Sequence, residues 1–361
     1  MRVLLLTDPS SIHSKRWVKS LCQRGFEVGV FGHIPSSEEA DYYSTIPNCE
    51  CFWVRKDGKG FLSKLTYLKV VVYLKLIIKE WTPDIVHAHW ATRYGLIGAL
   101  SGFHPLITSV WGSDVLILPR KSLLYRLIIK YVFKKSDYIF STSQSMADET
   151  AKYTRKDVKI TPFGVDTNVF KVDKDSIRNP IKIGIVKSLD NVYGIDILIR
   201  AFKELVERNS LKTIKLIIIG DGPQKFFYKE LVKELNLSSL VSFVGKIDNT
   251  ELPKFYNSFT VSVFPSRSES FGVVALESMA CECPVITSDA DGFKEIVEDG
   301  VSGIITKRGD ISGIVSAIQQ FIDNPDIRNK MGREGRERVM KYYSWENNVS
   351  TMISLYNIIK K

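Results

Sequence analysis

The feature that most constrains the fold of this chain is an alternation of short apolar runs with amphipathic segments, present in both halves of its 361 residues. Each apolar run has the length of a strand, and the segments between runs have the periodicity of a helix. Apolar strands that alternate with helices form parallel sheets covered on both faces. We therefore predict an α/β fold with two facing Rossmann-like domains, each a doubly wound parallel sheet, and a cleft between them.

The apolar runs place the predicted strands. Those of the first half are VLLLT (3–7), EVGVFGH (27–33), DIVHAHW (84–90), PLITSVWG (105–112), YIFSTS (138–143) and VKITPFGV (158–165). Those of the second half are IKIGIVK (181–187), KLIIIGDG (215–222), VSFVG (241–245), VSVFPS (261–266), PVITSD (284–289) and SGIIT (302–306). Helical patterns of the first half cover 14–24, 62–80, 92–101, 120–135 and 144–153.

A polar stretch between the two alternations predicts a linker. We expect residues 1–165 to form the first domain, 166–180 to be the linker and 181–340 to form the second domain. Residues 341–361 are expected to form a terminal helix, capped by Ser344, that packs back on the first domain. Ligands of parallel sheets bind beyond the carboxyl ends of the strands, so the loops after the strands are the candidate sites.

Composition is that of an ordinary globular protein, with 44% hydrophobic and 25% charged residues. Every apolar run is shorter than the roughly 18 residues that a membrane-spanning helix needs. The start, MRVLLLTDPS, lacks a signal-peptide cleavage site, so we expect a cytoplasmic protein. Cysteines are odd in number, and neither Cys-Glu-Cys pair, 49/51 or 281/283, has zinc-finger spacing. We therefore expect reduced thiols and no metal site.

The stretch SRSESFGVVALES (266–278) is the strongest candidate site. It follows a predicted strand, and its helix begins near Phe271 and Gly272, where backbone N–H groups lack intrahelical acceptors. Such a helix start binds phosphate, and a glycine allows close approach to the backbone. Glu269 lies in the loop before the helix, whereas Glu277 lies within it among apolar neighbours.

A carboxylate on an apolar helix surface is costly unless it is well hydrogen-bonded. A solvated face does not explain Glu277, because the helix has almost no polar face. Two interpretations remain: an internal salt bridge, or a group that accepts hydrogen bonds from paired hydroxyls such as those of a ribose. In the second, the helix start would hold the attached diphosphate and Glu269 would contact the group beyond it. The stretch would then bind a nucleotide-sugar along its length.

Signature stretches are spread over essentially the whole chain. They are the E-x7-E segment ESFGVVALESMACECPVITS, then PDIVHAHW, WGSDV, PFGVDTNVF, YGIDILIRAF, IIIGDGP, VSFVGKI, DGFKEIVEDGVSGIIT and YYSW. In this combination the chain resembles the retaining glycosyltransferases of family four, which have the GT-B architecture. The resemblance implies a donor site in the second domain, an acceptor site in the first, retention of configuration and no metal. It implies no cofactor besides the UDP- or GDP-linked sugar that is the substrate.

The resemblance also assigns roles to residues. Glu277 would hold the ribose of the donor, and Glu269 would hold the hydroxyls of the transferred sugar. The other implied donor-binding residues are Ser270, Phe271, Gly272, Val273, Tyr193, Gly220, Asp221, Gly245, Lys246 and Ile247. Among them, the amides of Phe271 and Gly272 would hold the diphosphate, and backbone near Gly245 would meet the nucleobase.

Three positions depart from the family. Where the family has an arginine and a lysine to neutralise the leaving diphosphate, this chain has Lys187 and Tyr193. A phenol can still donate to phosphate, so we expect weaker neutralisation. Glu282 replaces a glycine that can take the left-handed conformation, at a cost of about 1 kcal/mol. Trp111 replaces a histidine that approaches the transferred sugar.

Fewer sequence motifs indicate the acceptor-binding residues. The role of the missing histidine would pass to His89, to Asp114 or to no residue, and a packed core imidazole is an equal interpretation of His89. The first loop, TDPSSIHSKRW, lacks the paired glycines of many relatives, and Ser11 and His13 could supply donors instead. An ordinary capped helix start explains the same loop. With Trp111, these two residues are the candidate acceptor-binding set.

The net charge of +10 is concentrated in the first half, where residues 1–170 contain 23 Lys and Arg against 15 Asp and Glu, a surplus of 8. Arg126, Lys130 and Lys134 recur every four residues and form one stripe of a predicted helix. This stripe is either the solvated face of an internal helix or a contact with an anionic membrane, where a peripheral protein would meet a lipid-linked acceptor at the inner face. The charge lacks any nucleic-acid-binding signature, so nucleic acid is not an expected partner.

We predict a metal-independent retaining hexosyltransferase that moves a sugar to a hydroxyl of a glycan or lipid-linked acceptor. Its candidate catalytic residues are Glu269, Lys187, His89 and Asp114. Because no residue is an obvious nucleophile, we expect same-face attack with the leaving diphosphate stabilised by Lys187 and the helix start. The alternatives are a nucleotide-sugar epimerase of the same architecture and a non-catalytic nucleotide-sugar-binding scaffold. An NAD-dependent oxidoreductase is disfavoured, because neither first strand leads into Gly-x-Gly-x-x-Gly.

Overall fold

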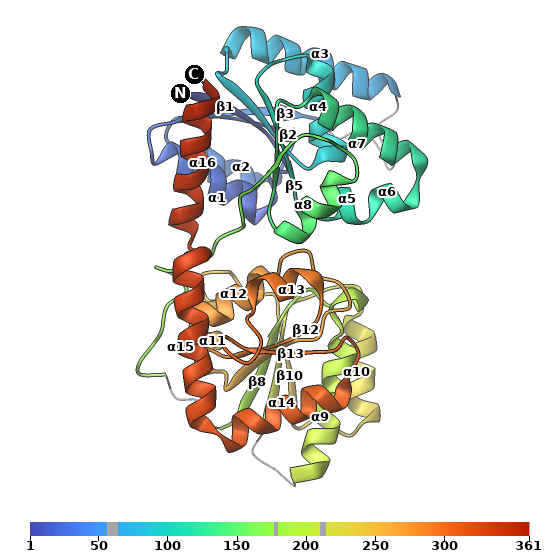
Figure 1. The fold of residues 1–361 in the computed structure, drawn as a ribbon, viewed down its shortest axis with the longest axis vertical. Coiled ribbons are helices and arrows are strands. Elements are labelled where there is room, and N and C mark those ends of the chain that lie inside the picture. The colour runs from blue at the N-terminus through green and yellow to red at the C-terminus, as the bar shows by residue number, and fades with distance from the viewer. Residues whose placement is uncertain (56–63, 177–179, 210–213, 361) are drawn as a thin grey trace. The chain divides into compact units, whose positions relative to one another are not determined.

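The computed structural model describes residues 1–55, 64–176, 180–209 and 214–360. They divide into unit 1, Met1–Pro162 with Asn348–Lys361, and unit 2, Phe163–Asn347. Residues 177–179 of the predicted linker and the first two residues of the predicted helix at 62–80 lie outside the described residues. Each unit is a parallel sheet with helices on both faces, which confirms the predicted fold class (Figure 1).

The sheet of unit 1 has seven strands in the order β3-β2-β1-β4-β5-β6-β7 among the described residues. The strands are β1 (Arg2–Leu6), β2 (Glu27–His33), β3 (Cys49–Val54), β4 (Ile85–His89), β5 (Leu106–Val110), β6 (Tyr138–Ser141) and β7 (Val158–Ile160). All neighbours are parallel; Leu4, for example, pairs with Gly29 and Val86. The prediction missed β3, because this edge strand is only partly buried and its apolar run, residues 51–54, is only four residues long.

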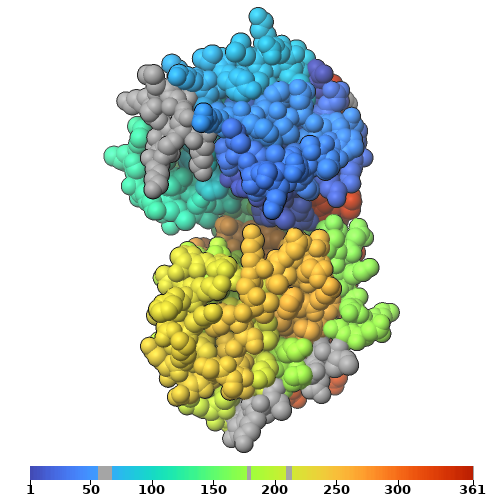
Figure 2. All heavy atoms as spheres, turned by 180° about the vertical axis from the view of Figure 1, so that it is seen from behind, coloured from blue at the N-terminus to red at the C-terminus, as the bar shows by residue number. Residues whose placement is uncertain are grey.

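Helices cover both faces of this sheet. They are α1 (Ile12–Cys22), α2 (Ser37–Ser44), α3 (Lys64–Trp81), α4 (Leu96–Ser101), α5 (Ser113–Leu116), α6 (Leu118–Lys121), α7 (Leu123–Lys135) and α8 (Gln144–Ala151). A hydrophobic core lies between the sheet and α3, α4, α7 and α8. The connections through α1 and α2 run the opposite way across the sheet, so these helices lie on its other face. The blue atoms in Figure 2 show that the N-terminal part of the chain forms much of the surface of unit 1 on one side.

The prediction also missed α2, although a local signal was present. Ser36 accepts a hydrogen bond from the backbone of Glu39, and the Glu39 carboxylate accepts one from the backbone of Ser36. This capping box is a reliable helix start, but the helix has only one fully buried side chain, Tyr43, and therefore no apolar periodicity.

Unit 2 has six strands in the order β10-β9-β8-β11-β12-β13 among its described residues. The strands are β8 (Lys182–Val186), β9 (Lys215–Ile219), β10 (Val241–Gly245), β11 (Val261–Phe264), β12 (Val285–Ser288) and β13 (Ile304–Thr306). The helices of unit 2 are α9 (Ile195–Asn209), α10 (Lys225–Glu234), α11 (Leu252–Ser258), α12 (Val273–Ala280), α13 (Asp291–Ile296), α14 (Ile311–Asp323) and α15 (Pro325–Tyr342), and α16 (Trp345–Lys360) begins in this unit. Glu282, after α12, has a φ of 53°, the left-handed conformation expected at this position.

The last helix, α16, contributes its residues from Asn348 onward to unit 1. Its Tyr356 is buried, with its hydroxyl 2.6 Å from Nδ1 of His87. Near the end of α16, Lys360 forms an ion pair with Asp84 at 3.2 Å. Before the helix, the Ser344 hydroxyl accepts a hydrogen bond from the backbone of Asn347 at 3.3 Å, as an N-cap residue does.

None of the helices in the described part of the chain has both the length and the apolar content to span a bilayer. The five cysteines are free thiols. The described residues contain no group of three or more His, Cys, Asp or Glu side chains arranged to hold a metal ion.

Candidate functional site

The predicted donor residues of unit 2 follow four neighbouring strands. Lys187 follows β8, Gly220 follows β9, Gly245 ends β10, and the loop at 265–272 follows β11. Because parallel strands place their carboxyl ends at one edge of a sheet, these segments share that edge. The packing is tight: the amide of Gly220 donates to the carbonyl of Gly245 at 2.8 Å, and a side chain at Gly220 would lie 1.9 Å from the Lys187 carbonyl.

Lys187 is held between a carboxylate and an aromatic ring. Its ammonium lies 2.6 Å from Oε2 of Glu269, and the two side chains are only 11% and 9% exposed. The same ammonium lies 4.4 Å from the centre of the Tyr193 ring, a distance at which a cation is attracted to the ring face. Tyr193 stands where the family has a lysine, and its ring therefore contacts Lys187, the cation that this chain retains.

Glu277 is buried on α12, and both of its oxygens accept hydrogen bonds. Asn249 donates to Oε1 and the Tyr256 hydroxyl to Oε2, each at 3.1 Å. Burial and the nearby carboxylate of Glu277 raise the pKa of Tyr256, so the phenol stays protonated and serves as the donor. A carboxylate oxygen has two lone pairs and can accept more than one hydrogen bond.

Asn249 and Tyr256 were not predicted from the sequence. Asn249 lies in the loop after β10, and Tyr256 lies on α11, 21 residues before its partner. Neither belongs to a recognisable motif. Only the folded sheet, in which the β10 loop and α11 approach α12, brings them to the carboxylate.

The start of α12 has the features of an anion site. Its N-cap residue, Gly272, has a φ of 98° and no side chain that could accept a hydrogen bond from the backbone of the helix start. We expected this glycine to allow a ligand close to the backbone, but an added Cβ would instead lie 2.7 Å from the ring of Phe293. The glycine thus allows the left-handed turn before α12 and leaves room for the Phe293 ring of α13. Phe271 is buried against Phe163 and Tyr343, which positions the amides of the turn.

A guanidinium that the prediction overlooked links two parts of the site. Arg267 forms a bidentate pair with Asp196 at 3.0 and 2.6 Å, and it also donates to the carbonyl of Asn191 at 2.6 Å. The helical turn Asn191–Tyr193 is thereby attached to the loop that carries Glu269. Gly194 ends this turn so close to the loop that a side chain there would lie 2.2 Å from the carbonyl oxygen of Pro265.

The remaining predicted donor residues lie at the same edge with different surroundings. Asp221 is exposed and accepts hydrogen bonds from Lys225 and from the amide of Gly222; the Lys225 hydrogen bond lowers its pKa. Gly245 has a φ of 92° and no atom within 4 Å of an added Cβ, so the space beside it is open. Lys246 after it is exposed, while Ile247, Ser270 and Val273 are half-buried.

In unit 1, His89 is a buried imidazole at the end of β4. Its Nδ1 lies 2.9 Å from the Thr7 hydroxyl, and its ring stacks on Trp111 at 4.4 Å. His13 meets the same Trp111 ring edge-on at 5.9 Å. Burial lowers the pKa of His89 well below its ordinary value, so the imidazole is neutral. The structure thus brings His13, His89 and Trp111 together.

Asp114 is fully buried, and its carboxylate braces a loop. It accepts hydrogen bonds from the amides of Ala91, Trp111 and Gly112 at 2.9 to 3.2 Å. Burial raises its pKa, while these backbone hydrogen bonds oppose that shift. Asp114 therefore holds the backbone of Trp111 in place. Ser11 lies at the N-cap of α1, where its side chain makes no capping hydrogen bond within the described residues.

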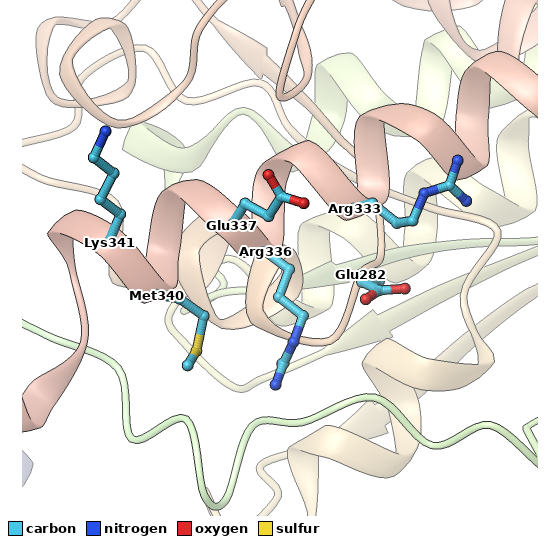
Figure 3. Close-up of a pocket in the computed structure, with 6 residues that line it drawn as sticks. All are labelled: Glu282, Arg333, Arg336, Glu337, Met340 and Lys341. Carbon is cyan, nitrogen blue, oxygen red and sulfur yellow. The ribbon is translucent and has the colours of Figure 1, made fainter.

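A surface pocket of about 490 Å³ lies elsewhere in unit 2. It is lined by Glu282, Arg333, Arg336, Glu337, Met340 and Lys341 (Figure 3). Five of these residues come from α15. Glu282 lies between α12 and β12, at the amino ends of the strands. The pocket is therefore at the opposite edge of the sheet from Lys187 and Gly220 and contains none of the predicted site residues.

Both halves of the chain match known protein families. Residues 167–338 match the family model of glycosyl transferases group 1, and residues 2–143 match that of glycosyl transferase 4-like proteins. An uncharacterized glycosyltransferase of Methanocaldococcus jannaschii is 30% identical over 78% of this chain and 77% of its own. The capsular polysaccharide biosynthesis glycosyltransferase CapM of Staphylococcus aureus is 26% identical over 81% of this chain and 82% of its own.

A solved structure shares the fold. Anabaena HepE, crystallised in complex with UDP, has a TM-score of 0.84 and 19% identity, over 99% of this chain and 100% of its own. The likeness at this low identity shows the architecture common to both chains.

Proposed function

Because this chain belongs to the family four glycosyltransferases of GT-B architecture, we propose that it moves a hexose from a UDP- or GDP-linked donor to a hydroxyl of a glycan or lipid-linked acceptor. Transfer would retain the anomeric configuration and need no metal. Unit 2 would bind the donor and unit 1 the acceptor. Capsular polysaccharide synthesis by CapM supports a glycan acceptor. An acceptor on a lipid carrier would make a membrane surface one of the partners.

The observation that carries the proposal is the setting of Glu277. The residue is 4% exposed, and its carboxylate receives hydrogen bonds from Asn249 and Tyr256. It lies on α12, the helix that follows the loop carrying Glu269, and Glu269 pairs with Lys187. A ribose on Glu277 would place its diphosphate at the start of α12. HepE, which shares the fold, was crystallised in complex with UDP, and this supports a nucleotide as a ligand of this chain.

Lys187 and Glu269 would act as a pair that separates when donor binds. The diphosphate would draw the Lys187 ammonium away from Glu269, and the freed carboxylate would accept hydrogen bonds from hydroxyls of the hexose. The acceptor oxygen would then attack the anomeric carbon on the face from which the diphosphate departs. As the bond from carbon to diphosphate oxygen breaks, that oxygen would take the acceptor proton, and Lys187 with the α12 amides would stabilise its charge.

The test is substitution of Glu277. Glu277→Ala should abolish the rise in melting temperature that UDP or GDP produces in the wild-type protein, and it should abolish transfer. Glu234→Ala, an exposed glutamate of α10, is the matched control and should bind and transfer normally. Near-normal transfer by Glu277→Ala would refute the assignment.

Nucleotide release separates the alternatives. A transferase releases UDP or GDP in proportion to added acceptor, an epimerase converts donor without acceptor, and a scaffold binds donor without converting it. Conversion of the donor into an isomeric nucleotide-sugar, without acceptor and without net release of nucleotide, would favour the epimerase.

A further inference from the structure

Helix α7 exposes an apolar stripe to solvent. Leu123, Leu127 and Tyr131 are 73%, 65% and 37% exposed, and their spacing of four places them on one side of the helix. The opposite side of α7 already packs in the core through Ile129 and Phe133. A helix that needs only one buried face has no structural use for the second apolar stripe.

Helix α3 repeats the pattern. Leu68, Val72 and Leu76 are 66%, 53% and 51% exposed and are again spaced by four. The core side of this helix is formed by other residues, among them Leu74 and Ile77. Exposed apolar side chains that gather in stripes, rather than singly, mark an interaction surface.

The two stripes lie on the same side of unit 1. Helix α4 packs against both α3 and α7, and all three cover one face of the sheet (Figure 1). On α4, Leu100 is 38% exposed. We name the exposed side of α3 and α7 the apolar–basic face; its apolar members are Leu68, Val72, Leu76, Leu123, Leu127 and Tyr131.

Cations flank each stripe of the apolar–basic face. Its exposed basic members are Lys69, Lys75 and Lys79 on α3 and Arg126, Lys130 and Lys134 on α7. They lie three or four positions from the apolar residues and hence beside them on the helix surface. Helix α7 contains no acidic residue. Long lysine and arginine stems can lie along an apolar surface while their charges stay in water.

We propose that the apolar–basic face rests on an anionic lipid bilayer. The leucines enter the boundary between headgroups and acyl chains, and the lysines and arginines contact lipid phosphates. A merely solvated helix face explains the cations but not the leucine stripes, and a purely apolar partner explains the leucines but not the cations. An anionic bilayer matches both, because it offers negative charge at its surface and hydrocarbon beneath.

Vesicle co-sedimentation of the full chain tests this proposal. The protein should sediment with vesicles of phosphatidylcholine and phosphatidylglycerol and far less with phosphatidylcholine alone, and high salt should weaken the binding. Leu123→Ser with Leu127→Ser should reduce the affinity at least about tenfold. Lys130→Gln with Lys134→Gln should reduce it about twenty-fivefold, because each cation contributes about fivefold.

Matched controls remove the same side-chain types elsewhere. Ile358→Ser changes a residue of α16 that is 62% exposed, and Lys330→Gln changes an exposed lysine of α15; both should bind like wild type. The proposal would be overturned if the wild-type protein did not sediment with anionic vesicles, or if the leucine variants bound them as tightly as wild type. A concentration-dependent dimer that the leucine variants abolish would also overturn it, since the face would then join protein copies.

Nucleotide binding, measured as a shift in melting temperature, tests the proposed function independently of vesicle binding. The leucine and lysine variants should show the wild-type nucleotide-induced shift in melting temperature, which also establishes that they fold. Glu277→Ala should still bind vesicles.

Discussion

The Lys187 ammonium lies 2.6 Å from Oε2 of Glu269, with both side chains about nine-tenths buried. A buried pair tolerates the loss of one partner poorly, because the other charge is left uncompensated. Lys187→Met should therefore lower the free energy of unfolding by ~3 kcal/mol, and Lys187→Met with Glu269→Gln should lower it by less than the two single changes together. Denaturant titration of the four proteins measures this coupling. Additive effects would show that the two side chains are energetically independent.

A second prediction concerns the hydroxyl that Tyr256 donates to Glu277 at 3.1 Å. Tyr256→Phe removes a hydrogen bond to a buried carboxylate and should cost ~2 kcal/mol of stability, with weaker nucleotide binding. Tyr228→Phe is the control, because the buried Tyr228 hydroxyl has no hydrogen-bond partner among the described residues. That change should be neutral. Equal effects of the two substitutions would contradict the role of Tyr256.

Arg267 gives a prediction about positioning. Lysine cannot reproduce its bidentate pair with Asp196, so Arg267→Lys should loosen the turn Asn191–Tyr193 that carries the ring beneath Lys187. We expect KM for the donor to rise severalfold while KM for the acceptor stays unchanged. Arg208→Lys, in an exposed pair with Glu204, should change neither. An unaltered donor KM in Arg267→Lys would remove the residue from the donor site.

Gly272 should resist substitution for two separable reasons. Gly272→Ala meets both a positive φ and the ring of Phe293 at 2.7 Å, so we expect a loss of ~3 kcal/mol. Gly309 has a φ of 81° but no atom within 4 Å of an added Cβ, so Gly309→Ala should lose only ~1 kcal/mol. Chemical denaturation compares the two. Equal losses would mean that the Phe293 ring moves aside freely.

Unit 1 should lose stability in mild acid. Burial lowers the pKa of His87 to about 3, and burial with the nearby Arg16 lowers that of His13 to about 4. Unfolded histidines take up a proton near pH 6.5, so between about pH 6.5 and 4 the unfolded chain binds more protons than the folded one. The free energy of unfolding should therefore fall as the pH is lowered through this window. Its slope approaches about 1.4 kcal/mol per pH unit for each such histidine.

Denaturant titrations at several pH values measure this slope. His87→Gln should make it shallower, because one neutral histidine is lost. A stability that stays constant between pH 7 and 5, within the window set by an unfolded pKa of about 6.5, would contradict the burial of these imidazoles.

The resemblance to a known family assigned most of the residues of the candidate site from the sequence. Lys187, Gly220, Gly245 and Glu269 share one edge of the sheet, as a parallel arrangement requires. The residues that hydrogen-bond to Glu277 and the guanidinium that pairs with Asp196 were not predictable. Asn249, Tyr256 and Arg267 belong to no motif, and each lies far along the chain from the group it contacts.

The sequence by itself determined the two parallel sheets, because apolar runs and amphipathic segments are local patterns that burial imposes on strands and helices. It also determined the E-x7-E segment, whose glycine, helix start and carboxylates are neighbours along the chain. Only the tertiary structure decided that Lys187 pairs with Glu269 across 82 positions, that His89 stacks on Trp111, and that leucines of α3 and α7 remain exposed. These relationships depend on the packing of elements that are distant along the chain. A periodic pattern shows where apolar and charged residues lie on a helix or strand, but it does not show which other residues they will contact.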